Sequence, residues 1–220
     1  DLKDKIGGMD AAIVDPDGDY NQGGTIALGA FEIELFGGSN DSSHYVNLGE
    51  GLLSGAKQYT IEMWATQQGV GNWSRILDYG PPIIDSSGFI GMTWTEGTNL
   101  HSNKIAVALG AGQTVFGAYR DIPYELGEKY HIVLVLDNSR NGATVLRWYV
   151  ASASAQAIAQ EDDYVEVPAD LTFFENSQLW LGRSRFSWDK TAHASYDEVR
   201  IWEGVMSNEA ILESHLAWSR

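Results

Sequence analysis

The most constraining feature of this sequence is a series of short apolar segments separated by turn-forming residues. Within each segment, apolar and polar residues alternate or β-branched and aromatic residues follow one another, which is typical of β-strands. Clusters of Gly, Asn, Asp, Ser or Pro separate the segments, as a sandwich or barrel of short strands requires. The predicted strands are residues 25–35, 44–48, 59–66, 75–79, 89–94, 104–109, 130–137, 144–151 and 178–183.

A helical pattern is confined to the end of the chain, at residues 207–218. Ser207 is the predicted N-cap of this helix, and Glu209 lies in its first turn. Because strands do not alternate with helices, a parallel sheet is not expected. The alanine-rich segment 151–160 fits either a short helix or a loop, and strand patterns continue on both sides of it. We therefore predict one all-β domain over residues 1–220, an antiparallel sandwich with a short C-terminal helix.

The composition excludes several classes of protein. The net charge of −16 argues against nucleic acid and anionic membranes as partners, since both attract a basic surface. No apolar run approaches the length of about 18 residues that a membrane-spanning helix needs. The chain has no cysteine, and its composition of 44% apolar residues with eight tryptophans indicates a globular protein that folds without disulfides. Because it begins at Asp1 without a signal peptide, we expect it to be part of a longer secreted protein.

The segment YDEVRIWEGVMSNEAI, residues 196–211, resembles the terminal signature of laminin-G-like domains in the concanavalin A-like lectin and glucanase superfamily. Four further segments resemble the family's motifs and follow in the family's order. They are LKDKIGGMDAAIV (2–14), YTIEMWATQ (59–67), EKYHIVLVLD (128–137) and LWLGRS (179–184). The resemblance implies a jelly roll of two antiparallel sheets. Members usually carry a further strand before the opening segment, and this chain is expected to begin just after it.

The same resemblance implies a structural calcium ion. In related glucanases an aspartate at the start of the last strand binds calcium together with backbone carbonyls, which places Asp197 and the carbonyl of Gly24 at such a site. The alternative is that Asp197 caps the strand. The acidic segment 15–24 has the D-x-D-x-D spacing of calcium loops, but Tyr20 and Ile26 stand where the EF-hand pattern needs Gly and Glu. That departure favours an ordinary hairpin loop.

Evidence for catalysis is weak. The closest match to the paired carboxylates of laminarinase-like relatives is FEIELFG, in which Glu32 and Glu34 share a face about 6.6 Å apart along a strand. It lacks the third carboxylate and precedes the expected catalytic strand, so a solvated face is favoured. The sequence also lacks G-x-S-x-G, H-E-x-x-H and G-x-x-x-x-G-K-[ST]. A non-catalytic protein is predicted, with a divergent glycosidase or polysaccharide lyase as an alternative.

Aromatic side chains are the candidate binding residues, because sugars present apolar C–H faces that stack on rings. In strand 59–66 the alternation directs Glu62 and Trp64 away from the core, unless a loop covers Trp64. Trp73 and Trp188 occur in polar, Gly- or Ser-rich loops, and Arg185 is near Trp188 in sequence.

The predicted function is that of an extracellular lectin-like module, which binds a glycan or glycoprotein through a concave face or a rim of loops. It would serve adhesion or polysaccharide targeting. The alternative outside the enzymes is a structural or oligomerising domain of a surface protein.

Overall fold

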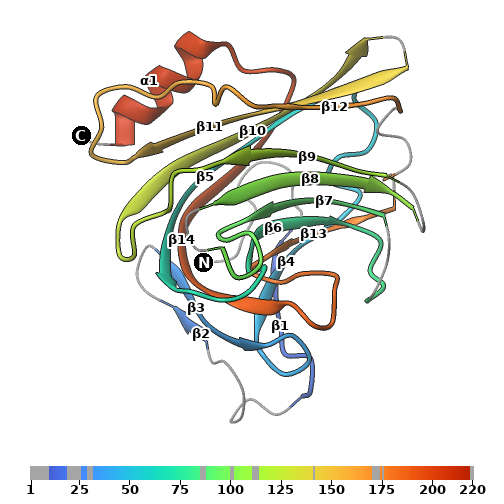
Figure 1. The fold of residues 1–220 in the computed structure, drawn as a ribbon, viewed down its shortest axis with the longest axis vertical. Coiled ribbons are helices and arrows are strands. Elements are labelled where there is room, and N and C mark those ends of the chain that lie inside the picture. The colour runs from blue at the N-terminus through green and yellow to red at the C-terminus, as the bar shows by residue number, and fades with distance from the viewer. Residues whose placement is uncertain are drawn as a thin grey trace.

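The computed structural model describes residues 10–18, 26–28, 32–84, 88–99, 102–110, 114–140, 142–169, 174 and 176–218. Within them, two antiparallel sheets of seven strands face each other (Figure 1). Sheet A has the strand order β1 (Ala12–Val14), β4 (Tyr45–Glu50), β13 (Gln178–Leu181), β6 (Arg75–Gly80), β7 (Gly88–Thr93), β8 (Asn103–Leu109) and β9 (Val115–Arg120). Sheet B has the order β12 (Val165–Val167), β11 (Ala143–Ser152), β10 (Lys129–Arg140), β5 (Gln58–Gly69), β14 (Lys190–Glu203), β3 (Ile33–Ser39) and β2 (Ile26–Leu28).

The core lies between the two sheets and follows from the alternation along their strands. In β5, Ile61, Met63 and Ala65 point inward as predicted, and none is more than 1% exposed. From sheet A, Leu77 and Ile90 pack into the same cluster. Each such large apolar side chain contributes about 1.5–3 kcal/mol when it is fully buried. The predicted all-β sandwich is confirmed.

The strand predictions are confirmed for most of the chain, with three kinds of difference. The predicted strand 25–35 contains two separate strands, β2 and the start of β3. The strands β1, β9 and β12 were not predicted. β14 is 14 residues long and begins well before Val199, where the apolar alternation becomes clear.

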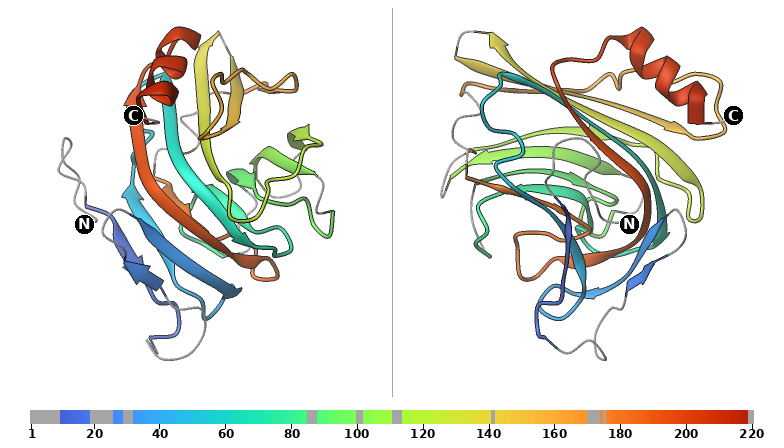
Figure 2. Two further views of the ribbon diagram at one scale, coloured as in Figure 1. Left: turned by 90° about the vertical axis from the view of Figure 1, so that its left-hand side faces the viewer. Right: turned by 180° about the vertical axis from the view of Figure 1, so that it is seen from behind.

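The C-terminal helix α1 (Asn208–Trp218) begins as predicted, because Ser207 Oγ accepts a hydrogen bond from the backbone N–H of Ala210 at 3.2 Å. It packs on the outer face of sheet B (Figure 2), where Ile211 joins a second apolar cluster with Val133 of β10. The segment after β11 is a loop rather than a helix. Within the described residues, no helix has the length and apolar character needed to cross a membrane.

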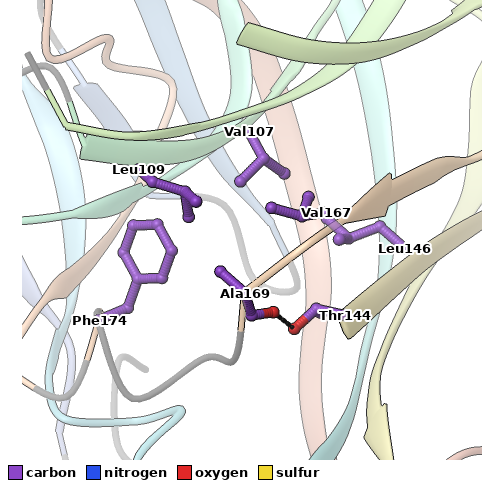
Figure 3. Close-up of a pocket in the computed structure, with 7 residues that line it drawn as sticks. All are labelled: Val107, Leu109, Thr144, Leu146, Val167, Ala169 and Phe174. Carbon is purple, nitrogen blue, oxygen red and sulfur yellow. Dashed lines mark hydrogen bonds between the residues drawn. The ribbon is translucent and has the colours of Figure 1, made fainter. Parts of the chain in front are cut away.

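A small apolar cavity lies between the sheets, near the β12 edge (Figure 3). It measures about 10 Å³, and its one described internal hydrogen bond joins Thr144 Oγ1 to the carbonyl of Ala169 at 2.7 Å. Ligand pockets measure about 300–1,000 Å³, so this cavity is a packing defect and not a binding site.

Candidate functional site

An aromatic cluster covers part of the outer face of sheet A. Phe89 of β7 meets Phe186 edge-on, with ring centroids 5.3 Å apart, and Trp188 lies tilted on Phe186 at 5.2 Å. Phe186 and Trp188 belong to the loop between β13 and β14, residues 182–189, which we call the β13–β14 loop. Trp188 is 68% exposed, the most exposed large apolar side chain among the described residues. The cluster therefore presents an indole ring to solvent.

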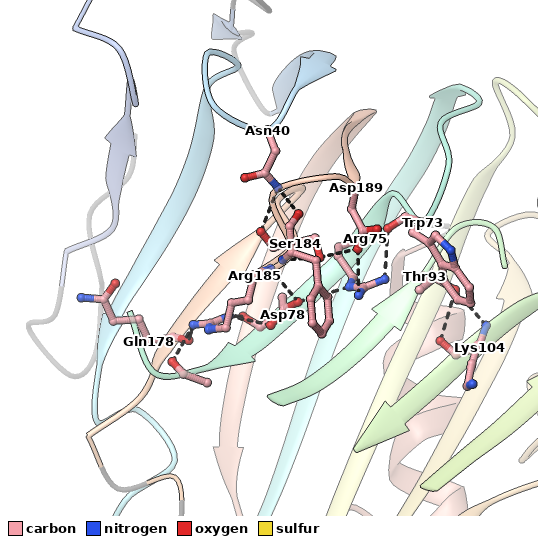
Figure 4. A network of polar contacts seen from close by, with 12 residues as sticks. Asn40, Trp73, Arg75, Asp78, Thr93, Lys104, Gln178, Ser184, Arg185 and Asp189 are labelled. Atoms are coloured by element: carbon pink, nitrogen blue, oxygen red, sulfur yellow. Dashed lines mark hydrogen bonds and ion pairs between the residues drawn. The ribbon is translucent and has the colours of Figure 1, made fainter. Parts of the chain in front are cut away.

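A buried ion pair fixes the β13–β14 loop to the sheet (Figure 4). Arg185 Nη1 lies 2.6 Å from Asp78 Oδ1, and both side chains are 0% exposed. The guanidinium also donates to the carbonyls of Gly80 and Pro81, and it stacks over the ring of Trp180 at 4.0 Å. Burial lowers the pKa of Arg185, but the charge of Asp78 opposes this effect and the group stays charged. Arg185 is buried and anchors the loop, so the exposure expected for it is wrong, and its predicted binding role stays a prediction.

Arg75 connects the β13–β14 loop to the loop between β5 and β6, residues 70–74. Its Nη1 donates to the carbonyl of Trp73 at 3.0 Å, and its Nη2 lies 3.2 Å from Asp189 Oδ2. Its Nε donates to Asp78 Oδ2 at 3.2 Å. Burial raises the pKa of Asp189, and the positive charge of Arg75 opposes that rise. One guanidinium thus holds both loops against β6.

Trp73 is half-buried and has a backbone φ of 53°, a left-handed conformation that is uncommon for a bulky residue. Its ring packs against Gly97, where an added Cβ would lie 3.2 Å from Trp73 Nε1. The neighbouring turn is fixed by a hydrogen bond of 2.7 Å from Thr95 Oγ1 to the carbonyl of Gly71. The backbone N–H of Lys190, which directly follows the β13–β14 loop, donates to the carbonyl of Asn72 at 3.1 Å. The two predicted loop tryptophans, Trp73 and Trp188, therefore lie on adjacent loops at one rim of sheet A.

Polar side chains lie on strands β7, β8 and β9 of sheet A, next to the aromatic cluster. Lys104 Nζ lies 2.8 Å from the hydroxyl of Tyr119 and 4.6 Å from the centroid of its ring. Thr93 Oγ1 accepts a hydrogen bond of 3.0 Å from the backbone N–H of Lys104. These neighbouring strands thus add an exposed ammonium and a phenol to the same face as the aromatic cluster.

Glu62 and Trp64 lie on the other sheet and are both 0% exposed. The alternation was predicted correctly, since both point out of the core, but α1 covers this face of sheet B. Trp64 stacks on His131 at 4.1 Å and on Trp218 of α1 at 4.9 Å. Glu62 lies 3.0 Å from His131 Nε2 and 3.3 Å from Arg200. The exposed placement predicted for Trp64 is wrong, and the cover is a helix rather than the loop given as the alternative.

Sequence reasoning missed Phe89, Phe186 and the contact between His131 and His215. Phe186 could have been found, because it lies two residues from Trp188 in a polar segment. The partners of Phe89 and His215 depend on which distant elements meet, and no local pattern indicates them.

Asp197 has a lysine as its cationic partner. Its Oδ2 lies 2.9 Å from Lys129 Nζ, and its side chain is 6% exposed. Across the described ranges, no three His, Cys, Asp or Glu side chains gather in a way that could hold a metal ion. Gly24, the predicted carbonyl ligand, lies outside the described residues, as does the rest of the segment 19–25. Among the described residues the Asp197 carboxylate is paired with Lys129, and the calcium site stays a prediction.

Comparison with known proteins assigns the family. The family model of the concanavalin A-like lectin/glucanases superfamily named for the laminin G domain matches residues 40–212. The chain therefore belongs to this laminin-G-like family, as the sequence motifs predicted. No curated protein matches the chain.

Solved structures share the fold at low identity. The botulinum neurotoxin serotype D binding domain superimposes with a TM-score of 0.60 at 10% identity, covering 96% of this chain and 48% of that one. The enzymatically active domain of bacteriophage CBA120 tailspike protein 2 gives 0.58 at 14%, covering 83% and 27%. The CBM40 of the Ruminococcus gnavus IT-sialidase, bound to α2,3 sialyllactose, gives 0.54 at 12%, covering 78% and 95%. The chain spans between about a quarter and a half of the toxin and tailspike chains. These likenesses show the fold alone.

Proposed function

We propose that this chain is a non-catalytic, extracellular lectin-like module that binds a glycan or glycoprotein at the rim formed by the β13–β14 loop and the 70–74 loop. The observation that carries the proposal is Trp188, which is 68% exposed on a loop held by buried ion pairs. A tryptophan left in solvent on a fixed loop has the geometry of a binding residue, because little conformational entropy is lost when a ligand covers it.

The chemistry around Trp188 suits a sugar. An indole face offers apolar area to the C–H face of a pyranose, and polar groups nearby can bind its hydroxyls. Half-buried Trp73, exposed Asn72 and exposed Lys190 lie on the same rim. The family and the structural similarity to the sialyllactose-bound CBM40 support a glycan as the ligand. The similarity to the botulinum neurotoxin binding domain supports a binding module.

The buried carboxylates of this region act in structure rather than catalysis. Asp78 and Asp189 are 0% and 3% exposed, and both pair with Arg75. Asp189 also accepts a hydrogen bond of 2.6 Å from Ser184 Oγ. Glu34, one of the pair Glu32 and Glu34 considered for catalysis, pairs with His193 at 3.3 Å on a solvated part of β3. These contacts favour the non-catalytic function.

A glycan array probed with the wild-type protein, with and without chelator, tests the proposal. At least one glycan should bind, and Trp188→Ala should weaken that binding by about 1–3 kcal/mol without changing the melting temperature. Trp202→Ala is the matched control, since Trp202 is 40% exposed but lies at the end of β14 in sheet B. An array with no bound glycan, or equal loss in both variants, would contradict the proposal.

A further inference from the structure

Arg183 differs from the other arginines whose side chains the structure describes. Each of the others has a carboxylate oxygen between 2.6 and 3.8 Å away, namely Arg75, Arg120, Arg147, Arg185 and Arg200. Arg183 has no such ion pair with any described residue, although the chain contains 30 Asp and Glu against 14 Lys and Arg. It is nevertheless only 7% exposed. Asp41 acts on it electrostatically without such a contact, and a nearly buried guanidinium without a counter-ion in direct contact is costly.

The surroundings of Arg183 hold its guanidinium in a fixed place. The group lies over the ring of Tyr45 at 4.6 Å and over the ring of Trp180 at 5.5 Å. Its Nε donates to Asn40 Oδ1 at 3.1 Å. The Asn40 amide is itself oriented, because its Nδ2 donates to the carbonyls of Ser184 and Phe186 at 2.9 and 3.1 Å. Arg183 is therefore part of a built arrangement and is not a mobile surface side chain.

The Nη edge of Arg183 is the part of the guanidinium that can meet a ligand. Its Nε donates to Asn40 Oδ1, Tyr45 is a further side-chain hydrogen-bond partner of the guanidinium, and neither Nη is among the fully buried side-chain atoms that lack a partner. The outer edge of the guanidinium therefore reaches solvent. Burial lowers the pKa of Arg183, whereas its interactions with Tyr45 and Asp41 raise it. A guanidinium remains charged at neutral pH in either case. Because Nε is engaged by Asn40, the edge formed by the two Nη groups is the one that matches a carboxylate in bidentate geometry.

We propose that Arg183, oriented by Asn40 and held between Tyr45 and Trp180, binds the carboxylate of an acidic sugar. This inference rests on the proposed glycan-binding function and adds the class of sugar. Arg183 begins the loop that carries Trp188 five residues later, which is a separation of about 17 Å at most. One oligosaccharide can thus place an acidic residue on Arg183 and a neutral residue near Trp188. A local cation also explains how a chain with a net charge of −16 could hold an anionic ligand.

The test is calorimetric titration of the full chain with two acidic probes, α2,3-sialyllactose and a tri-galacturonate. Each probe is compared with a neutral counterpart in which the carboxylate is reduced to an alcohol. The wild-type protein should bind at least one acidic probe roughly tenfold to a hundredfold more tightly than its reduced counterpart, because charge-assisted hydrogen bonds are lost. The probe that shows this difference tells whether the carboxylate belongs to a sialic or a uronic acid.

Substitutions of Arg183 test whether this residue causes the preference for the acidic probe. Arg183→Ala and Arg183→Lys should both remove most of the preference for the acidic probe, since lysine lacks the planar fork. Arg147→Ala is the control, because Arg147 pairs with Asp137 at 3.8 Å on sheet B and should leave the preference unchanged. The comparison of acidic and reduced probes uses wild-type protein, so it stays decisive even if an Arg183 variant does not fold.

Three results would overturn the inference. The first is equal affinity for acidic and reduced probes. The second is a preference for acid that persists in folded Arg183→Ala. The third is an array on which only neutral glycans bind in a Trp188-dependent way, which leaves the proposed glycan-binding function intact. Failure of every glycan, acidic or neutral, would instead overturn that function and this inference together.

Discussion

His131 and His215 face each other across the contact between β10 and α1, with their Nδ1 atoms 3.2 Å apart and both rings buried. Their outer nitrogens are also bonded, His131 Nε2 to Glu62 Oε1 and His215 Nε2 to the carbonyl of Ala155, each at 3.0 Å. A carbonyl and an ionised carboxylate only accept hydrogen bonds, so both Nε2 atoms carry protons. A hydrogen bond between the two Nδ1 atoms would then need a third proton, which would add a positive charge to two buried rings.

This arrangement predicts that acid loosens the fold. Burial lowers the pKa of His131, and the charges of His215 and Arg200 lower it further. The hydrogen bond and charge of Glu62 raise this pKa but do not outweigh burial. Burial raises the pKa of Glu62, but hydrogen bonds from His131 and Ser214 and nearby positive charges outweigh burial and lower it. Free histidine titrates at about 6.5, so below that pH the unfolded chain binds a proton that folded His131 resists. The free energy of unfolding should fall by at most about 1.4 kcal/mol per pH unit from this group.

Thermal melts at pH 7.5, 6.5 and 5.5 measure this dependence. His131→Gln should flatten the slope between pH 6.5 and 5.5. His193→Gln should not, because the His193 side chain is 37% exposed and pairs with Glu34 near solvent. Parallel slopes for the wild type and His131→Gln would show that the buried pair does not titrate in this range.

The Arg185–Asp78 pair predicts a large loss of stability when one partner is removed. Arg185→Ala leaves buried Asp78 with Arg75 as its remaining partner and removes the donor to the carbonyls of Gly80 and Pro81. Breaking a buried pair in this way costs about 3–5 kcal/mol. Urea unfolding should show that loss, whereas Arg147→Ala, which breaks a more exposed pair, should cost less than about 1 kcal/mol. Similar midpoints for the two variants would mean that Arg75, through Asp189, is enough to hold the loop.

Gly182 predicts a steric requirement where the β13–β14 loop begins. Its φ is 79°, and a Cβ at this position would clash with Leu35 Cδ1, whose side chain is fully buried. Gly182→Ala should therefore destabilise the protein by about 2–4 kcal/mol through backbone strain and overpacking. Gly55→Ala separates the two causes, because Gly55 has a φ of 93° but nothing within 4 Å, so it should cost about 1–2 kcal/mol. Equal costs would assign the whole effect to the backbone.

Local patterns predicted the core of the sandwich and its final helix. The period of two in β5 assigns Ile61 and Met63 to the interior without knowledge of their partners, and Ser207 marks the helix start by its own hydrogen bond. β9 was missed because the sequence VFGAYR contains a central glycine and reads as a turn. The first half of β14 was missed because KTAHASYD is mostly polar and small.

The site residues depend on contacts that no local pattern contains. Arg185 lies in a polar segment that predicts exposure, but its partner Asp78 is 107 residues away in sequence and brings it into the interior. Trp64 was correctly assigned to the outer side of its strand, yet its burial depends on where α1 packs. Trp73 and Trp188 were predicted from loop composition alone, and Arg75 explains why their loops meet.

The calcium prediction for Asp197 can be tested by removing Lys129, which would compete with calcium for the carboxylate. Lys129 Nζ lies 2.9 Å from Asp197 Oδ2, so a calcium ion would have to displace this ammonium before it could bind the carboxylate. A calcium-binding Asp197 therefore predicts that Lys129→Met increases the effect of calcium. An ion that binds only the folded state adds about 2.7 kcal/mol at a hundredfold excess over Kd, which should raise the melting temperature by several degrees.

Melting curves with calcium and with chelator should then differ most in Lys129→Met, less in the wild type and not at all in Asp197→Ala. The last variant is the control for weak binding elsewhere on this acidic surface. If the three proteins respond alike, the calcium effect does not involve Asp197, and the carboxylate serves as the partner of Lys129. In that case an ion pair links β10 to β14 at the position where the resemblance to the glucanases places a metal ion.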